Sequence, residues 1–167
     1  ILAVALTMFV FPVQAKMVLK LGHVAPKISN EGKFADKFAE LVVEKTKGEI
    51  VIEVFPSAQL GKTVAMLDST ILGNQDIYFG GNVELERFVP GQKLLNIPFS
   101  VRDHEHFRKF LASPLWEEIF VDPLEKVGLK VLGSGWERGP FRIMVSKKPV
   151  KSSEDLIGLK LRIASIE

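Results

Sequence analysis

Two arginines near the end of the chain, Arg142 and Arg162, lie in apolar stretches where a charged side chain needs a partner. The stretches are "FRIMVSK" and "LKLRIAS", and both have the pattern of a β-strand. An unpaired guanidinium buried in such a strand is costly, whereas its planar fork of donors matches a carboxylate. These arginines therefore indicate a site that captures an organic anion. The alternative for Arg162 is an ion pair with a neighbouring Asp or Glu, and the residue pattern alone leaves both interpretations open.

Three further residues follow predicted strands and are candidate ligand contacts. His23 closes "VLKLGHV", while Gly81 and Asn82 follow "QDIYFG". In open parallel sheets, ligands bind beyond the carboxyl ends of the strands, so these residues are expected at the cleft. Gly80-Gly81 is not part of a phosphate-loop pattern. The expected role of these glycines is to let the backbone approach a ligand closely, because they carry no side chain. The alternative for His23 is that its ring fills the edge of the sheet.

Other chemistries find little support in the sequence. His104 and His106 have a spacing found in some metal sites, but the charged residues around them are typical of a solvated helix start. Gly133-Ser134-Gly135 does not match the GxSxG pattern of a hydrolase nucleophile. The sequence therefore predicts no metal, no cofactor and no catalytic residue. An enzyme acting on carboxylates is the alternative, with His23 as its only plausible general acid or base.

Composition fits a globular chain with enough apolar residues for a core. The 167 residues are 47% hydrophobic and 25% charged, with a formal net charge of +2. This balance predicts binding neither to nucleic acid nor to an anionic membrane surface. The chain has no cysteine, which excludes disulfides and thiol nucleophiles.

The first 15 residues, "ILAVALTMFVFPVQA", are uncharged and apolar over the length of a signal peptide. Small residues precede Lys16, which is expected to begin the mature chain, although the basic start of a signal peptide is missing. This pattern predicts export to the periplasm, with no stable membrane insertion of the mature chain. A buried N-terminal helix is the alternative.

Strands and helices alternate after this segment, which predicts a mostly parallel sheet covered by helices. The first helix is expected from Ser29 or Asn30 to about Thr46, with Phe34, Phe38, Leu41 and Val42 on its buried face. The segment 103–126 is expected to be helical, with interruptions at Pro114 and Pro123. The other expected elements are strands at 18–24, 49–56, 75–81, 93–99 ("KLLNIPF"), 129–136, 141–147 and 159–164, a helix at 62–72, and a turn at 152–156 capped by Ser152 or Ser153 and stopped at Gly158.

Four phrases in this order resemble the solute-binding subunits of tripartite ATP-independent periplasmic (TRAP) transporters, the DctP-like family. They are "LKLGHVAP", "GEIVIEVFPSAQLG", "LLNIPF" and "DLIGLKLR". The second phrase is the most specific, because a strand ending at Pro56 leads directly into the turn that opens the next helix. Family members are about twice as long, so the chain is expected to be a fragment covering roughly the N-terminal half.

The resemblance implies an α/β, periplasmic-binding-protein-like fold of two lobes. Lobe I would span 16–139 and be nearly complete, while lobe II would begin at 140 and be truncated at 167, with a hinge near Gly139-Pro140. By the same resemblance, Arg162 pairs with the substrate carboxylate and Arg142 assists it. The loops after His23 and at Gly81-Asn82 would close over the ligand from lobe I.

The implied function is capture of a small organic acid and its delivery to the TRAP membrane subunits, without chemical transformation. Gly81 stands where some sialic-acid-binding members carry an acidic ligand contact, which argues against that substrate. Two alternatives remain open: a secreted α/β enzyme acting on a carboxylate, and the binding lobe of another uptake or sensor system.

Overall fold

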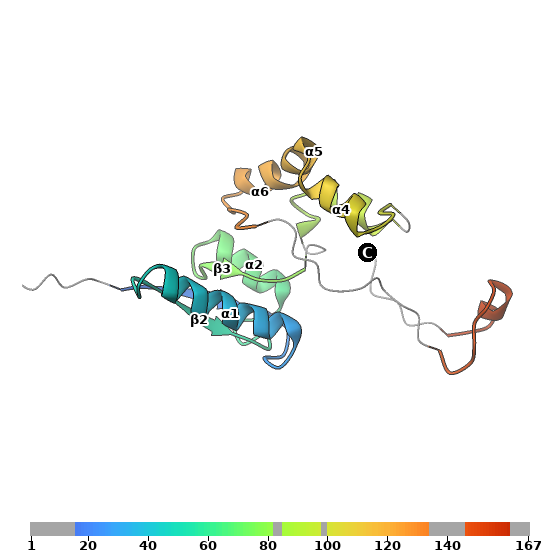
Figure 1. The fold of residues 1–167 in the computed structure, drawn as a ribbon, viewed down its shortest axis with the longest axis horizontal. Helices are drawn as coiled ribbons and strands as arrows, with labels where there is room; N and C mark the ends of the chain where they lie inside the picture. The colour runs from blue at the N-terminus through green and yellow to red at the C-terminus, as the bar shows by residue number, and fades with distance from the viewer. Residues whose placement is uncertain (1–15, 82–84, 98–99, 134–145, 161–167) are drawn as a thin grey trace, which may run out of the picture. The chain divides into compact units, whose positions relative to one another are not determined.

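The computed structural model describes residues 16–81, 85–97, 100–133 and 146–160. The chain divides into two compact units, Ile1–Trp136 and Glu137–Glu167. The first unit contains a small sheet with two long helices, followed by a group of shorter helices (Figure 1). The described part of the second unit contains a single 3-10 turn.

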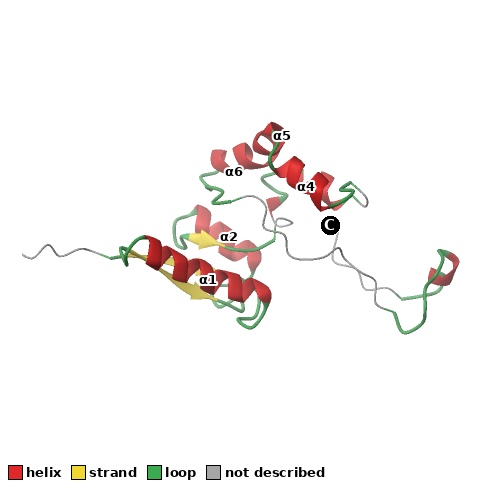
Figure 2. Ribbon diagram, viewed as in Figure 1, coloured by secondary structure: helices red, strands yellow, loops and turns green. Residues whose placement is uncertain are grey.

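The sheet has three parallel strands in the order β2-β1-β3. They are β1 (Met17–Gly22), β2 (Ile50–Phe55) and β3 (Ile77–Tyr78). Register runs from Met17 opposite Ile50 to Gly22 opposite Phe55, and Gly22 also lies opposite Tyr78. The prediction of a parallel α/β sheet is therefore confirmed, and Figure 2 shows the strands beside α1.

Helix α1 (Asn30–Lys45) begins where the sequence predicts, because the Ser29 hydroxyl accepts a hydrogen bond of 3.1 Å from the Gly32 amide. The predicted burial of Phe34 is wrong, since its side chain is 53% exposed. Ala35 and Ala39 face the sheet instead, because small side chains let the helix backbone lie close to the strands. The cluster between α1 and the sheet consists of Leu19, Leu21, Ala35, Phe38, Ala39, Val42, Ile52, Val54, Ile77 and Phe79.

Helix α2 (Thr63–Ile71) lies against the opposite face of the sheet. Successive strand residues point to opposite faces, and Leu21 belongs to the α1 cluster. A β-carbon built on the next residue, Gly22, would lie 2.8 Å from the sulfur of the fully buried Met66 in α2. Both faces of the sheet are therefore covered at the end of β1, as in doubly wound α/β folds.

The second group of helices in this unit has its own apolar cluster. The elements are α3 (Gln92–Asn96), α4 (His104–Leu111), α5 (Pro114–Trp116), a π-helical turn (Glu117–Val121) and α6 (Asp122–Lys126). The buried residues are Val89, Trp116, Phe120, Val121 and Leu124. The predicted interruption at Pro114 is confirmed, because Pro114 begins a new helical segment after Ser113. The interruption predicted at Pro123 is wrong, because helical backbone continues from the π-helical turn into α6 without a break.

Two predicted elements are wrong in the described residues. "KLLNIPF" forms helix α3 rather than a strand: Leu95 packs on the apolar cluster, while Leu94 is 56% exposed. Such a short apolar run has no periodicity that separates a strand from a helical turn. Residues 129–133 form no strand, and 134–136 lie outside the described residues. Most of the predicted strand 159–164 also lies outside the described residues, so it stays a prediction.

The described part of the second unit forms a 3-10 turn, Glu154–Leu156. Neither predicted serine caps it with a side chain. The carboxylate of Asp155 accepts the amides of Lys151 at 2.8 Å and Ser152 at 3.0 Å instead, and these bonds lower its pKa. Gly158 follows at a φ of 78°, which confirms it as the stop.

Replacing Gly32 with alanine is expected to destabilise the protein, although glycine to alanine normally stabilises a helix. A β-carbon at this position would lie 2.3 Å from the carbonyl oxygen of Lys27, which belongs to the backbone and cannot rotate away. Displacing that loop is expected to cost about 1–3 kcal/mol of unfolding free energy in urea titrations. The exposed neighbour supplies the control, Lys33→Ala; equal stability of the two variants would contradict the prediction.

Candidate functional site

The candidate site is the carboxyl edge of the three-stranded sheet. The strands are parallel and in register, so Gly22, Phe55 and Tyr78 end side by side. The loops that follow them, 23–29, 56–62 and 79–81, begin at this one edge. This is the position at which open parallel sheets bind ligands.

Backbone hydrogen bonds tie the three loops together at their bases. The His23 amide donates to the Phe55 carbonyl at 3.1 Å, and the Phe79 amide donates to the Gly22 carbonyl at 3.0 Å. In return, the Ala58 amide donates to the His23 carbonyl at 3.0 Å. Both backbone polar groups of His23 are thus held by β2 and the turn after it.

The imidazole of His23 is buried at the end of β1, with only 1% of the residue exposed. Its ring meets the edge of Phe79, with centroids 6.1 Å apart and planes inclined by 78°. Neither ring nitrogen has a hydrogen-bond partner among the residues that the structure describes. A buried imidazole normally satisfies both nitrogens, so this ring retains one donor and one acceptor for a further group.

Burial lowers the pKa of His23 from its ordinary value of 6.5, and the nearby carboxylates of Asp36 and Glu31 oppose the shift only in part. The ring is therefore neutral in the folded protein at neutral pH. A neutral imidazole can donate to a carboxylate or exchange hydrogen bonds with a hydroxyl.

This shift predicts that stability falls as the pH is lowered below 6.5. The unfolded chain then binds a proton on His23 that the folded chain excludes, whereas above 6.5 both states are neutral and the contribution vanishes. Urea midpoints measured from about pH 7.5 to about pH 5 should fall less steeply for His23→Phe than for the wild type. The exposed His104→Gln is the control; identical slopes for His23→Phe and the wild type would refute the assignment.

The glycines after β3 have unequal surroundings. A β-carbon on Gly80 would lie 2.0 Å from the Tyr78 hydroxyl, so a larger residue here would have to displace the end of that side chain. This reason differs from the predicted approach to a ligand. Gly81 is half-buried at the same edge as His23, and Asn82 lies outside the described residues.

The arginines Arg142 and Arg162 also lie outside the described residues, as does the predicted hinge at Gly139-Pro140. Their roles remain predictions. The structure adds two residues that sequence reasoning missed, Ser57 and Ala58, whose amides hold the loop after β1. The phrase "FPSAQLG" could have indicated a special turn after β2, but neither serine nor alanine indicates an unusual backbone conformation.

The paired histidines are part of a helix start. Asp103 caps α4 by accepting the His106 amide at 2.7 Å, and Nδ1 of His106 accepts the Arg102 amide at 3.2 Å. Within the described ranges, no group of three or more His, Asp or Glu side chains is placed to hold a metal ion. The same ranges contain no helix long and apolar enough to cross a membrane.

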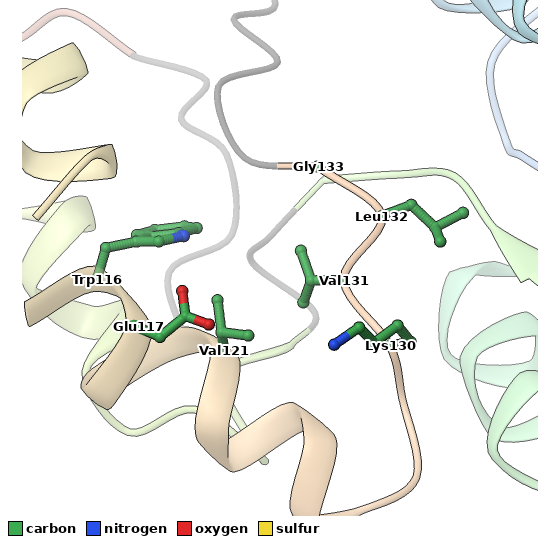
Figure 3. Close-up of a pocket in the computed structure, with 7 residues that line it drawn as sticks. All are labelled: Trp116, Glu117, Val121, Lys130, Val131, Leu132 and Gly133. Carbon is green, nitrogen blue, oxygen red and sulfur yellow. The ribbon is translucent and has the colours of Figure 1, made fainter. Parts of the chain in front are cut away.

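A separate cavity of about 170 Å³ lies in the helical group (Figure 3). Trp116, Glu117 and Val121 line one side, and the segment Lys130–Gly133 lines the other. Lys130 forms an ion pair with Glu125, which raises the pKa of the lysine. Among the described residues that line the cavity, Lys130 is the cation and Glu117 adds a carboxylate, which disfavours this cavity for an acid.

Comparison with known proteins connects the fold to a family. Residues 21–166 match the sequence model of DctP, described as bacterial extracellular solute-binding protein, family 7. The 2,3-diketo-L-gulonate-binding periplasmic protein YiaO of Escherichia coli is 34% identical over 148 residues, covering 89% of this chain and 44% of the relative. The chain thus spans less than half the length of this curated relative.

Solved structures of solute-binding proteins also match this chain in fold. A TRAP periplasmic solute-binding protein from Polaromonas, bound to D-erythronate, has a TM-score of 0.61 and 32% identity, covering 68% of this chain and 37% of that one. One from Sulfurospirillum deleyianum, with bound succinate, has a TM-score of 0.62 and 32% identity over 68% of this chain and 36% of that one. These matches extend the similarity from sequence to fold.

Proposed function

Because this chain belongs to the DctP family of extracellular solute-binding proteins, which serve TRAP transporters, we propose that it captures a small organic acid. In this proposal the protein binds the acid outside the cytoplasmic membrane and delivers it, unchanged, to the TRAP membrane subunits. The observation that carries the proposal is the carboxyl edge of the sheet, where three tied loops surround a neutral histidine with unused hydrogen-bonding capacity.

The carboxylate is the group that we expect the site to recognise. The ligands named for the three similar proteins, 2,3-diketo-L-gulonate, D-erythronate and succinate, all carry one. A strand-borne arginine is the side chain best suited to it, so we assign this role to Arg162 with assistance from Arg142. The family resemblance supports these two positions.

The loops of the carboxyl edge would supply the other half of the site. Lobe I, spanning 16–139, would contribute His23, Gly81 and Asn82, while lobe II, from 140 onward, would contribute the arginines. Closure about Gly139-Pro140 would remove water from the acid, which strengthens its ion pair with the guanidinium. The neutral His23 ring suits a hydroxyl or a second carboxylate of the ligand.

Export of the protein to the periplasm is consistent with the proposed role in capturing an external acid. The apolar segment 1–15 supports secretion to the periplasm, where the relative YiaO is named as a binding protein. The proposed partners are the small carboxylate and the TRAP membrane subunits. No catalytic step is part of the proposal.

Calorimetry on the full-length protein tests the proposal with acids and their neutral analogues. Succinate and D-erythronate are paired with succinamide and erythritol, which keep the carbon chains without the charge. We expect at least one acid to bind and both neutral analogues to fail. Equal binding of an acid and its analogue would remove the carboxylate as the recognised group, and turnover of either acid would favour an enzyme.

A further inference from the structure

The turn after β2 contains two consecutive residues in the left-handed region of backbone space, Ser57 at φ 55° and Ala58 at φ 60°. Residues other than glycine rarely adopt this conformation, and strained backbone is retained where the surrounding structure uses it. In the part of the chain that the structure describes, Lys47, at φ 51°, is the one other non-glycine residue with positive φ.

Two amides of this turn donate hydrogen bonds to the neighbouring loop. The Ser57 amide donates to the Ala25 carbonyl and the Ala58 amide donates to the His23 carbonyl, each at 3.0 Å. The turn then closes on itself, because the Gly61 amide donates back to the Ala58 carbonyl at 3.0 Å. The backbone angles of Ser57 set the direction of the Ala58 amide, so a right-handed Ser57 would turn that amide away from the His23 carbonyl.

The consequence reaches the ring of His23. Its amide is already held by Phe55, so the bond from Ala58 fixes the second side of its backbone. The side chain lies against Phe79 in a fully buried position, where a shift of the backbone must move the ring. A change in the conformation of the turn is therefore expected to move the His23 ring at the edge of the sheet.

We propose that Ser57 and Ala58 are positioning residues of the binding site: their left-handed turn fixes the His23–Ala25 loop and, through it, the orientation of the buried imidazole at the carboxyl edge of the sheet. This inference rests on the proposed function for its effect on ligand affinity. Its effect on the ring does not depend on any ligand.

A pair of valine substitutions tests the proposal, since a β-branched residue strongly disfavours positive φ. Ala58→Val strains the turn at the carboxyl edge. Lys47→Val imposes the same backbone strain at the opposite edge, between α1 and β2. Ala58→Gly is the rescue variant, because glycine adopts the left-handed conformation without strain. All are made in the full-length protein.

Nuclear magnetic resonance of the ligand-free protein reports the ring through its tautomer and imidazole shifts. We expect Ala58→Val to change the His23 signals and Ala58→Gly and Lys47→Val to preserve them. Calorimetry with succinate and D-erythronate should show a loss of about tenfold or more for Ala58→Val alone. Unchanged His23 signals in Ala58→Val, or equal changes in Lys47→Val, would overturn the positioning role.

The experiment distinguishes a failure of the proposed ligand class from a failure of the positioning role. If neither acid binds the wild type, the proposed ligand class fails while the His23 signals still decide the positioning role. If Ala58→Val does not fold, amide hydrogen exchange of the wild type decides instead. Protection of the Ser57 and Ala58 amides is expected, and exchange as fast as in an exposed turn would refute the proposal.

Discussion

Replacing Arg162 with alanine in the full-length protein is expected to weaken the binding of its acid ligand by about two to three orders of magnitude. Removing one member of a buried charge pair costs about 3–5 kcal/mol, and each tenfold change in affinity corresponds to about 1.4 kcal/mol. The loss is large because the ligand carboxylate would be left desolvated without its counter-charge. Calorimetry with whichever acid binds the wild type measures it.

Two further variants make this prediction specific. Arg162→Lys keeps the charge but loses the two parallel hydrogen bonds, so a substantial loss is expected there as well. Arg102→Ala removes an exposed arginine before α4 and should leave affinity unchanged. If both Arg162 variants bind as the wild type does, Arg162 is not the carboxylate partner, and Arg142 becomes the residue to test.

Replacing Trp116 with alanine is expected to lower the unfolding free energy by about 3–5 kcal/mol. The indole stacks on Phe120 with ring centroids 4.0 Å apart and meets the edge of Phe110 at 5.6 Å. It is only 7% exposed within the apolar cluster of the helical group. Its removal would leave a void next to the cavity that it already lines. Urea unfolding followed by far-ultraviolet circular dichroism measures the effect.

The matched control is Trp116→Phe, which keeps an aromatic ring on Phe120. The indole Nε1 has no hydrogen-bond partner among the described residues, so losing this donor removes no bond seen there. We expect the phenylalanine variant to lose much less stability than the alanine variant. A loss of equal size in both would contradict the prediction, because a phenyl ring stacked on Phe120 would then not maintain the cluster.

The elements around the sheet could be predicted because their boundaries depend on local chemistry. A run of β-branched residues defines β2, Ser29 caps α1, and Gly73 at φ 75° follows α2. The buried face of α1 could not be predicted in the same way. How closely a helix approaches a sheet is a tertiary property, and here the spacing favours Ala35 over the larger Phe34.

The candidate site also has a part that could be predicted from the sequence and a part that could not. Sequence order alone placed His23 and Gly81 after parallel strands, and the structure has both at one edge of the sheet. The left-handed turn at Ser57-Ala58 could not be predicted, because neither residue type favours positive φ. The backbone bonds made across the edge keep it in that conformation, and those contacts exist only once β1 and β2 have paired.

The two apolar clusters of the first unit have a consequence for the order in which the protein folds. Among the residues that the structure describes, the sheet cluster draws on those between Leu19 and Phe79, and the helical cluster on those between Leu85 and Val131. Each cluster thus comes from one continuous stretch of chain, which keeps the loops that must close short. The first can assemble before the second has left the ribosome or the export channel. The edge that carries His23 can therefore form as soon as the chain through Gly81 is available.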